Sequence, residues 1–194
     1  MNGIVRTAVI LITADDLRTV RASPDYAARP DHVEAEAIKA AFRARRAERR
    51  PFFLTGEELN QVFQWKLRGA HERTAFQRDR NTELAYRAVT EAVFRIVGPD
   101  IEYESVVRLG LLSALAGVGV PLASAVLGLT EPDQYCVIDR RGWRAIFGKE
   151  RESFTPFDYV HYLGKVARLA AELGWPIQET DAAVREYDRR HGRC

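Results

Sequence analysis

The amino-acid sequence predicts a mainly α-helical fold with few or no strands. Long stretches consist of good helix formers, and several of them are preceded by an N-cap residue and followed by proline or glycine. Their apolar residues recur at helical spacing rather than in the alternating pattern of strands. Residues 4–12 are typical of a short strand or a buried segment, and residues 131–138 are expected to hold a turn and an extended piece.

The composition is that of a folded globular protein. Hydrophobic residues make up 46% and charged residues 29% of the 194 residues. The net charge of +2 gives little bulk attraction to polyanions, so nucleic-acid binding would depend on local patches. Two cysteines exclude a disulfide framework and a four-cysteine metal site. The early apolar run, residues 8–12, is too short to span a bilayer, and we expect a cytoplasmic protein without a membrane partner.

Residues 1–50 are expected to form an N-terminal extension, followed by a helical domain over residues 51–194. The extension would consist of the 4–12 segment, a loop and an arginine-rich helix that Asp31 is placed to cap. We interpret the basic end of this helix as a solvated face. Its arginines are Arg43, Arg45, Arg46, Arg49 and Arg50.

Two further helices are expected before residue 100. Thr55, followed three residues later by Glu58, forms a capping-box signature for a helix that runs to about Arg68. Residues 73–80 are predicted to be a polar connection. Asn81 is then expected to open an amphipathic helix, because apolar residues recur at helical spacing behind it.

The most informative stretch is a predicted helical hairpin with the sequence LLSALAGVGVPLASAVLGL, residues 111–129. Helices over residues 105–115 and 121–129 are joined by a short turn in which glycines permit backbone angles closed to other residues. Free N–H groups at the start of the second helix form an anion site that suits a DNA phosphate. The residues expected to contact DNA here are Gly117, Val118, Gly119 and Val120.

Asp139 follows this hairpin, twenty residues after Gly119 and directly after an apolar pair. It stands where a helix through Trp143 to Phe147 needs its N-cap. A carboxylate fixed in this way can cap the helix and also take part in chemistry, since the two roles are compatible.

Hairpin and aspartate together resemble the helix-hairpin-helix superfamily of base-excision DNA glycosylases. In that superfamily a leucine-rich helix precedes Gly-hydrophobic-Gly, an alanine follows, and an aspartate begins the next helix. The matching residues here are Gly117, Val118, Gly119, Ala123 and Asp139. The chain is also similar to a bacterial branch related to the 8-oxoguanine DNA glycosylase fold, whose members carry the motifs Trp-Lys-x-x-Arg and Asp-x-Arg. Here Trp65-Lys66 is followed by Arg68, one position earlier than in the first motif, and Asp139 is followed by Arg141 as in the second.

The resemblance implies a glycosylase-like helical fold and an enzyme that excises a damaged or modified base flipped from duplex DNA. Asp139 would be its catalytic carboxylate. Bifunctional members carry a lysine nucleophile two positions after the second glycine, where this chain has Pro121. We therefore expect water to attack, which leaves an abasic site without strand cleavage. Lys66 could replace that lysine only if its helix packs beside the hairpin, and otherwise it would pair with an acid or a phosphate.

Five more residues are candidates for binding DNA. Arg68, Arg140 and Arg141 could contact phosphates, and Trp65 and Trp143 could line a pocket for the extruded base. A salt-bridged surface and an apolar core are the alternative roles of these two groups.

Cofactor and partner expectations are limited. The four histidines show no metal-ligand spacing, so no metal site is expected, and the only cofactor considered is a monovalent cation at the hairpin. The expected partner is duplex DNA, bound by a monomer. The alternative to an enzyme is a non-catalytic module of the same fold that binds DNA or a partner protein.

Overall fold

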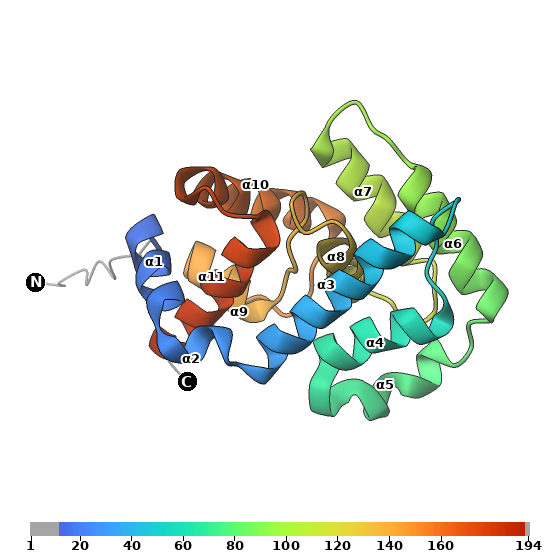
Figure 1. Ribbon diagram of the computed structural model, residues 1–194, viewed down its shortest axis with the longest axis horizontal. Helices are drawn as coiled ribbons and strands as arrows, with labels where there is room; N and C mark the ends of the chain where they lie inside the picture. The colour runs from blue at the N-terminus through green and yellow to red at the C-terminus, as the bar shows by residue number, and fades with distance from the viewer. Residues whose placement is uncertain (1–11, 193–194) are drawn as a thin grey trace, which may run out of the picture.

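The computed structural model describes residues 12–192, and every regular element among them is a helix (Figure 1). The prediction of a mainly helical protein is thereby confirmed. The short strand or buried segment expected over residues 4–12 falls on residues outside the described range, apart from Ile12. None of the described helices is long and apolar enough to cross a membrane.

The helices follow one another through short connections. Their bounds are α1 (Ala14–Ala22), α2 (Pro24–Ala27), α3 (Pro30–Glu48), α4 (Gly56–Leu67), the 3-10 turn η1 (Arg68–Ala70), α5 (His71–Arg78), α6 (Glu83–Arg95), α7 (Ile101–Leu112), α8 (Val120–Thr130), α9 (Arg140–Phe147), α10 (Pro156–Leu173) and α11 (Ile177–His191).

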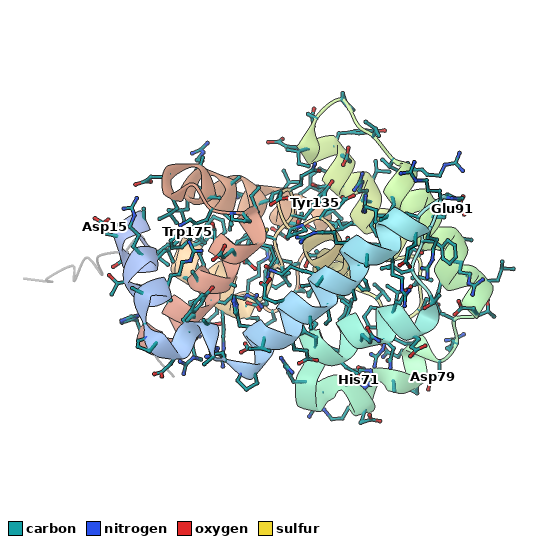
Figure 2. The ribbon with its side chains drawn as sticks, in the orientation of Figure 1. Asp15, His71, Asp79, Glu91, Tyr135 and Trp175 are labelled. Carbon is teal, nitrogen blue, oxygen red and sulfur yellow. The ribbon has the colours of Figure 1, made fainter. Side chains whose placement is uncertain are left out.

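Helix α8 is the centre of the fold. All but two of its residues are buried, and its sequence VPLASAVLGLT carries no charge. A helix that is apolar all round must be covered on all sides. Here α3, α4, α7 and α10 pack around it, and Figure 1 shows α3 crossing in front of it. Tyr135, just beyond α8, is fully buried in the interior, whereas Asp15 and Asp79 stand on the outer surface (Figure 2).

The N-terminal helices belong to this same core. Leu17 and Val20 of α1, and Ile38 and Phe42 of α3, are members of the one buried cluster that also contains the residues of α8. Helix α1 packs against α11 and α10, while α3 packs against α4 and α8. The boundary expected at residue 50 therefore does not separate two cores.

The capping-box prediction for α4 is confirmed, but the expected start of α3 is wrong. Thr55 accepts a hydrogen bond from the Glu58 amide, and the Glu58 side chain accepts one from the Thr55 amide. Helix α3 begins at Pro30 behind Arg29 rather than behind Asp31. The Asp31 carboxylate instead accepts two hydrogen bonds from the Arg29 guanidinium, each 3.0 Å long.

Residues 73–80, expected to be a polar connection, lie mostly within helix α5. The side chain of Arg78, which is buried, lies back along this helix and stabilises it. Its guanidinium donates to the His71 carbonyl at 2.8 Å and to the Thr74 hydroxyl at 2.7 Å. A sequence with few apolar residues is thus held by charge-assisted hydrogen bonds within the helix.

Candidate active site

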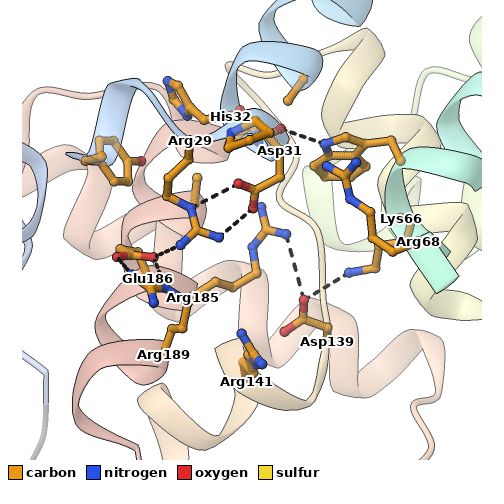
Figure 3. Close-up of a pocket in the computed structure, with 16 residues that line it drawn as sticks. Arg29, Asp31, His32, Lys66, Arg68, Asp139, Arg141, Arg185, Glu186 and Arg189 are labelled. Carbon is orange, nitrogen blue, oxygen red and sulfur yellow. Dashed lines mark hydrogen bonds and ion pairs between the residues drawn. The ribbon is translucent and has the colours of Figure 1, made fainter.

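A cavity of about 530 Å³ is lined by residues from five places in the fold (Figure 3). They are α2 with the connection that follows it, the start of α3, the end of α4, the start of α9, and α11. Charged side chains dominate its lining. Six are cationic and three are carboxylates: Arg29, Lys66, Arg68, Arg141, Arg185 and Arg189, with Asp31, Asp139 and Glu186.

Asp139 and Lys66 meet in this cavity. Asp139 caps α9 as expected, and its Oδ1 accepts the Gly142 N–H at 2.9 Å. Its Oδ2 accepts a hydrogen bond from Nζ of Lys66 at 3.1 Å. Lys66 lies on the face of α4 that also carries Leu59, Val62 and Phe63, which are buried. Its helix packs against α8, the second helix of the hairpin, which is the packing that Lys66 would need to take the place of the missing hairpin lysine.

Asp139 and Lys66 each shift the pKa of the other. Burial by itself would raise the pKa of Asp139, but the Lys66 ammonium and the Arg185 guanidinium outweigh it and lower that pKa to about 2. Burial lowers the pKa of Lys66, and Arg185 adds to this effect, while Asp139 opposes both. Asp139 is consequently ionised at neutral pH, and Lys66 gives up its proton more readily than an exposed lysine.

Arg185 is a site residue that the sequence analysis did not identify. Its Nη1 lies 3.8 Å from Oδ2 of Asp139, and its Nε lies 3.4 Å from Oδ2 of Asp181 one helical turn earlier on α11. Asp181 is fully buried and is held by the Tyr162 hydroxyl at 2.5 Å. The sequence offered one weak signal, an Asp-to-Arg pair at i, i+4 that encloses apolar Ala183 and Val184. Such pairs also occur on exposed helix faces, so this one did not mark a buried site.

The hairpin is formed, but its turn does not line the cavity. Gly117 adopts a φ of +73°, which favours glycine, and Gly119 is the exposed N-cap of α8. Val118 and Val120 are buried. The amides of Gly119 and Val120 donate to no acceptor among the described residues, which leaves two N–H groups at the start of α8 for a ligand.

Asn81 secures the turn of the hairpin. Its Oδ1 accepts the Ala116 N–H at 2.8 Å, and its Nδ2 donates to the Ala116 carbonyl at 3.0 Å. The expectation that Asn81 opens a helix is wrong, because α6 begins at Glu83 behind Thr82, whose hydroxyl accepts the Ala85 amide.

The predicted arginines occupy different positions. Arg68 lines the cavity and is paired with Glu34 at 2.5 Å. Arg141 also lines it, is exposed, and forms no ion pair with any residue between 12 and 192. Arg140 is exposed as well but does not line the cavity.

The two tryptophans are separated. Trp65 lines the cavity, and its indole N–H donates to the Asp31 carbonyl at 2.8 Å. Trp143 points elsewhere and packs against Phe147, with ring centroids 4.1 Å apart, and against Phe154. Helix α9 starts at the cavity but turns its aromatic face into the core, so Trp143 does not belong to a base pocket with Trp65.

No group of three or more metal-binding side chains occurs within the described part of the chain. Comparison of the sequence and structure with protein-family models, with curated proteins and with solved structures found no match. What this protein does is therefore inferred from the site itself.

Proposed function

We propose that the protein is a DNA N-glycosylase that releases a damaged or modified base flipped out of duplex DNA. The observation that carries this proposal is the Lys66–Asp139 pair at the edge of a cavity of about 530 Å³. That volume lies within the range of small-molecule sites, which suits a single extruded nucleotide. The predominantly cationic lining suits the phosphates that accompany it.

Asp139 would act on the sugar. Positive charge develops on the deoxyribose as the bond between C1′ and the base breaks, and an ionised carboxylate beside it stabilises that charge. Because Lys66 and Arg185 keep the pKa of Asp139 near 2, the carboxylate is ionised before substrate arrives. Water then attacks C1′, and the products are the free base and an abasic site.

The position of Lys66 favours a second route by the same enzyme. A buried amine with a lowered pKa can itself attack C1′, with formation of a Schiff base that leads to strand cleavage. Water attack comes first in our proposal, because the Lys66 ammonium is paired with Asp139 in the resting protein and a protonated amine is no nucleophile.

DNA would reach this cavity along one feature outside it and one at its rim. The amides of Gly119 and Val120, which have no acceptor among residues 12–192, suit one backbone phosphate at the start of α8. Arg141, at the cavity rim, suits another. Such contacts fix the duplex in place and carry no sequence information.

A panel of duplexes, each with one lesion, tests the proposal directly. Strand cleavage that requires alkali indicates an abasic product, whereas a complex trapped by borohydride indicates the lysine route. Asp139→Asn should reduce both at least about a hundredfold. Salt-dependent duplex binding with no base released from any lesion would instead favour the non-catalytic DNA-binding module.

A further inference from the structure

The side chain of Arg185 reaches from α11 into the cavity, toward Asp139 (Figure 3). It is 19% exposed, compared with 46% for Arg68 and 43% for Arg189. Arg141 is exposed as well. Among these four arginines of the lining, Arg185 is therefore the one that lies deepest.

The guanidinium of Arg185 has five N–H donors but forms no hydrogen bond with any residue between 12 and 192. Its Nε is enclosed by the protein, whereas Nη1 and Nη2 reach the accessible surface. A guanidinium that is largely removed from solvent usually donates several charge-assisted hydrogen bonds. The two terminal nitrogens are thus available to a ligand in the cavity.

Asp181 fixes this guanidinium from the protein side. Its Oδ2 lies 3.4 Å from Nε of Arg185 and accepts the Val137 N–H at 3.1 Å, while its Oδ1 accepts the Tyr162 hydroxyl at 2.5 Å. Burial would lower the pKa of Arg185, but Asp181 and Asp139 outweigh it and raise that pKa above its usual value. Arg185 is therefore a permanent cation, anchored near Nε and free at its terminal nitrogens.

A planar wall lies beside this cation. The guanidinium carbon of Arg185 is 5.6 Å from the ring centroid of Trp65. Trp65 lines the cavity and is itself fixed by its hydrogen bond to the Asp31 carbonyl. Two terminal nitrogens of one guanidinium donate in parallel to neighbouring acceptors. The pair suits a planar anion, whose ring would lie near the indole and whose charge would face the guanidinium.

Base release produces such an anion. When the bond between C1′ and the base breaks, its electron pair stays on the base nitrogen, so the sugar becomes cationic and the base anionic. Asp139 would face the sugar. Arg185, whose Nη1 is 3.8 Å from Oδ2 of Asp139, is close enough to face the base. Water then adds to C1′, and the proton that it loses neutralises the released base through solvent.

We propose that Arg185 is a further catalytic residue, which binds the departing base as its anion through Nη1 and Nη2. The proposal rests on the proposed glycosylase activity and goes beyond it by assigning the group that stabilises the leaving base. A phosphate is the other anion that a guanidinium binds. The depth of Arg185 and its position beside Trp65 favour the base, whereas exposed Arg141 suits a phosphate.

Equilibrium binding to the full chain tests this site without any catalysis. The probes are two pairs of bases, 5-nitrouracil with uracil and urate with hypoxanthine, of which the first member of each pair is an anion at neutral pH. We expect each anion to bind at least about tenfold more tightly than its neutral relative. Arg185→Gln should reduce this preference to less than about threefold. Arg185→Lys keeps the counter-ion of Asp181 and Asp139, so it should fold and retain a preference of about fivefold.

Two further variants separate Arg185 from the net charge of the cavity. Arg141→Gln removes an equal charge from the rim and should weaken binding of inorganic phosphate but not the preference for planar anions. Arg190→Gln lies on the same helix, is exposed and does not line the cavity, and it should change neither. Equal losses of the preference in Arg141→Gln and Arg185→Gln would overturn the proposal. So would an Arg185→Gln variant that weakens phosphate binding alone, which would indicate a phosphate site.

Base release supplies a measurement that a purely structural role of Arg185 would not change. Fluorine withdraws electrons, so 5-fluorouracil leaves more easily than uracil without help from the protein. In single-turnover assays, Arg185→Gln should therefore slow uracil release at least about threefold more than 5-fluorouracil release. A loss of folded protein would slow both equally. If the parent releases a different base, that base and an analogue with an electron-withdrawing substituent take their place.

The binding and release experiments together distinguish failure of this proposal from failure of the proposed function. An Arg185-dependent preference for planar anions without any base release would refute the enzyme and leave the anion site intact. Base release without that preference, or with equal losses for both leaving bases in Arg185→Gln, would refute the role of Arg185 alone. Neither preference nor release would refute both.

Discussion

Nζ of Lys66 lies 3.1 Å from Oδ2 of Asp139, although 73 residues separate the two in the chain. The same oxygen is 3.8 Å from Nη1 of Arg185, so two cations share one carboxylate oxygen. The two cations lower the pKa of Asp139 and so keep it ionised. The Arg185 guanidinium, which carries the same charge as the Lys66 ammonium, also lowers the pKa of Lys66. Sharing of this kind links the titration of three side chains from α4, α9 and α11.

Asp139→Asn should reduce base release at least about a hundredfold, because a neutral amide no longer stabilises positive charge on the sugar. Asparagine caps a helix as well as aspartate does, so α9 should persist. The variant should still lose about 1–3 kcal/mol of unfolding free energy, since Lys66 and Arg185 lose their counter-ion. Single-turnover assays and urea unfolding measure the two effects.

Asp100→Asn is the matched control for this change. Asp100 caps α7 in the same way, with its Oδ1 accepting the Tyr103 amide at 2.8 Å, and it lies outside the cavity. Its replacement should leave base release unchanged. Equal losses in both variants would mean that Asp139 matters only as a helix cap.

Acid titration should show that Lys66 controls Asp139. The pKa of Asp139 is lowered from 3.8 to about 2 on folding, so its contribution to stability is present above about pH 4 and is lost as the pH falls through about 2. In Lys66→Met the largest charge that lowers this pKa is removed and burial remains. The Asp139 midpoint should then rise, as followed by carboxyl NMR. An unchanged midpoint would show that the ion pair does not set it.

Lys66→Arg tests which group attacks the sugar. Arginine keeps the positive charge beside Asp139 but has no amine that can form a Schiff base. Under water attack, we expect the variant to keep base release within about tenfold of the parent, and neither protein to be trapped by borohydride. A trapped complex in the parent that disappears in Lys66→Arg would assign the lysine route instead.

Gly117→Ala should destabilise the hairpin by about 1–3 kcal/mol and weaken duplex binding. The residue has a φ of +73°, and an added Cβ would lie 2.9 Å from Cβ of Gln77 and 3.0 Å from Cγ of Arg78. Gly110→Ala is the control, because it lies in α7 with open space around the new Cβ and should stabilise by up to about 1 kcal/mol. Chemical unfolding and fluorescence anisotropy with a duplex measure both variants; equal stability changes would contradict the steric explanation.

Features set by a few neighbouring residues were predictable from the sequence. The capping box at Thr55 and the cap at Asp139 need only a side chain and an amide three residues on, and both are present. Helix α5 was missed for the opposite reason. Its stability depends on the buried guanidinium of Arg78 rather than on an apolar face, and arginine in a polar stretch gives no sign of that.

The cavity itself was only half predictable. Asp139 and Lys66 stand next to recognisable patterns, whereas Tyr26, Gln178 and Arg185 come from α2 and α11, which lie far apart in the chain. Nothing local marks these three residues as neighbours. Trp143 illustrates the reverse error: it stands four residues after Asp139, yet one turn of helix carries its side chain into the core.

The cavity takes its walls from opposite regions of the chain, around α2 and from α11. Because a protein is synthesised from its N-terminus, a ribosome-bound chain that has not yet produced α11 already contains Lys66 and Asp139 but lacks the α11 wall of the cavity. A translation product interrupted before residue 177 would lack Arg185 and Gln178 as well. An unfinished copy therefore lacks one wall of the cavity, and under the proposed function it should release no base.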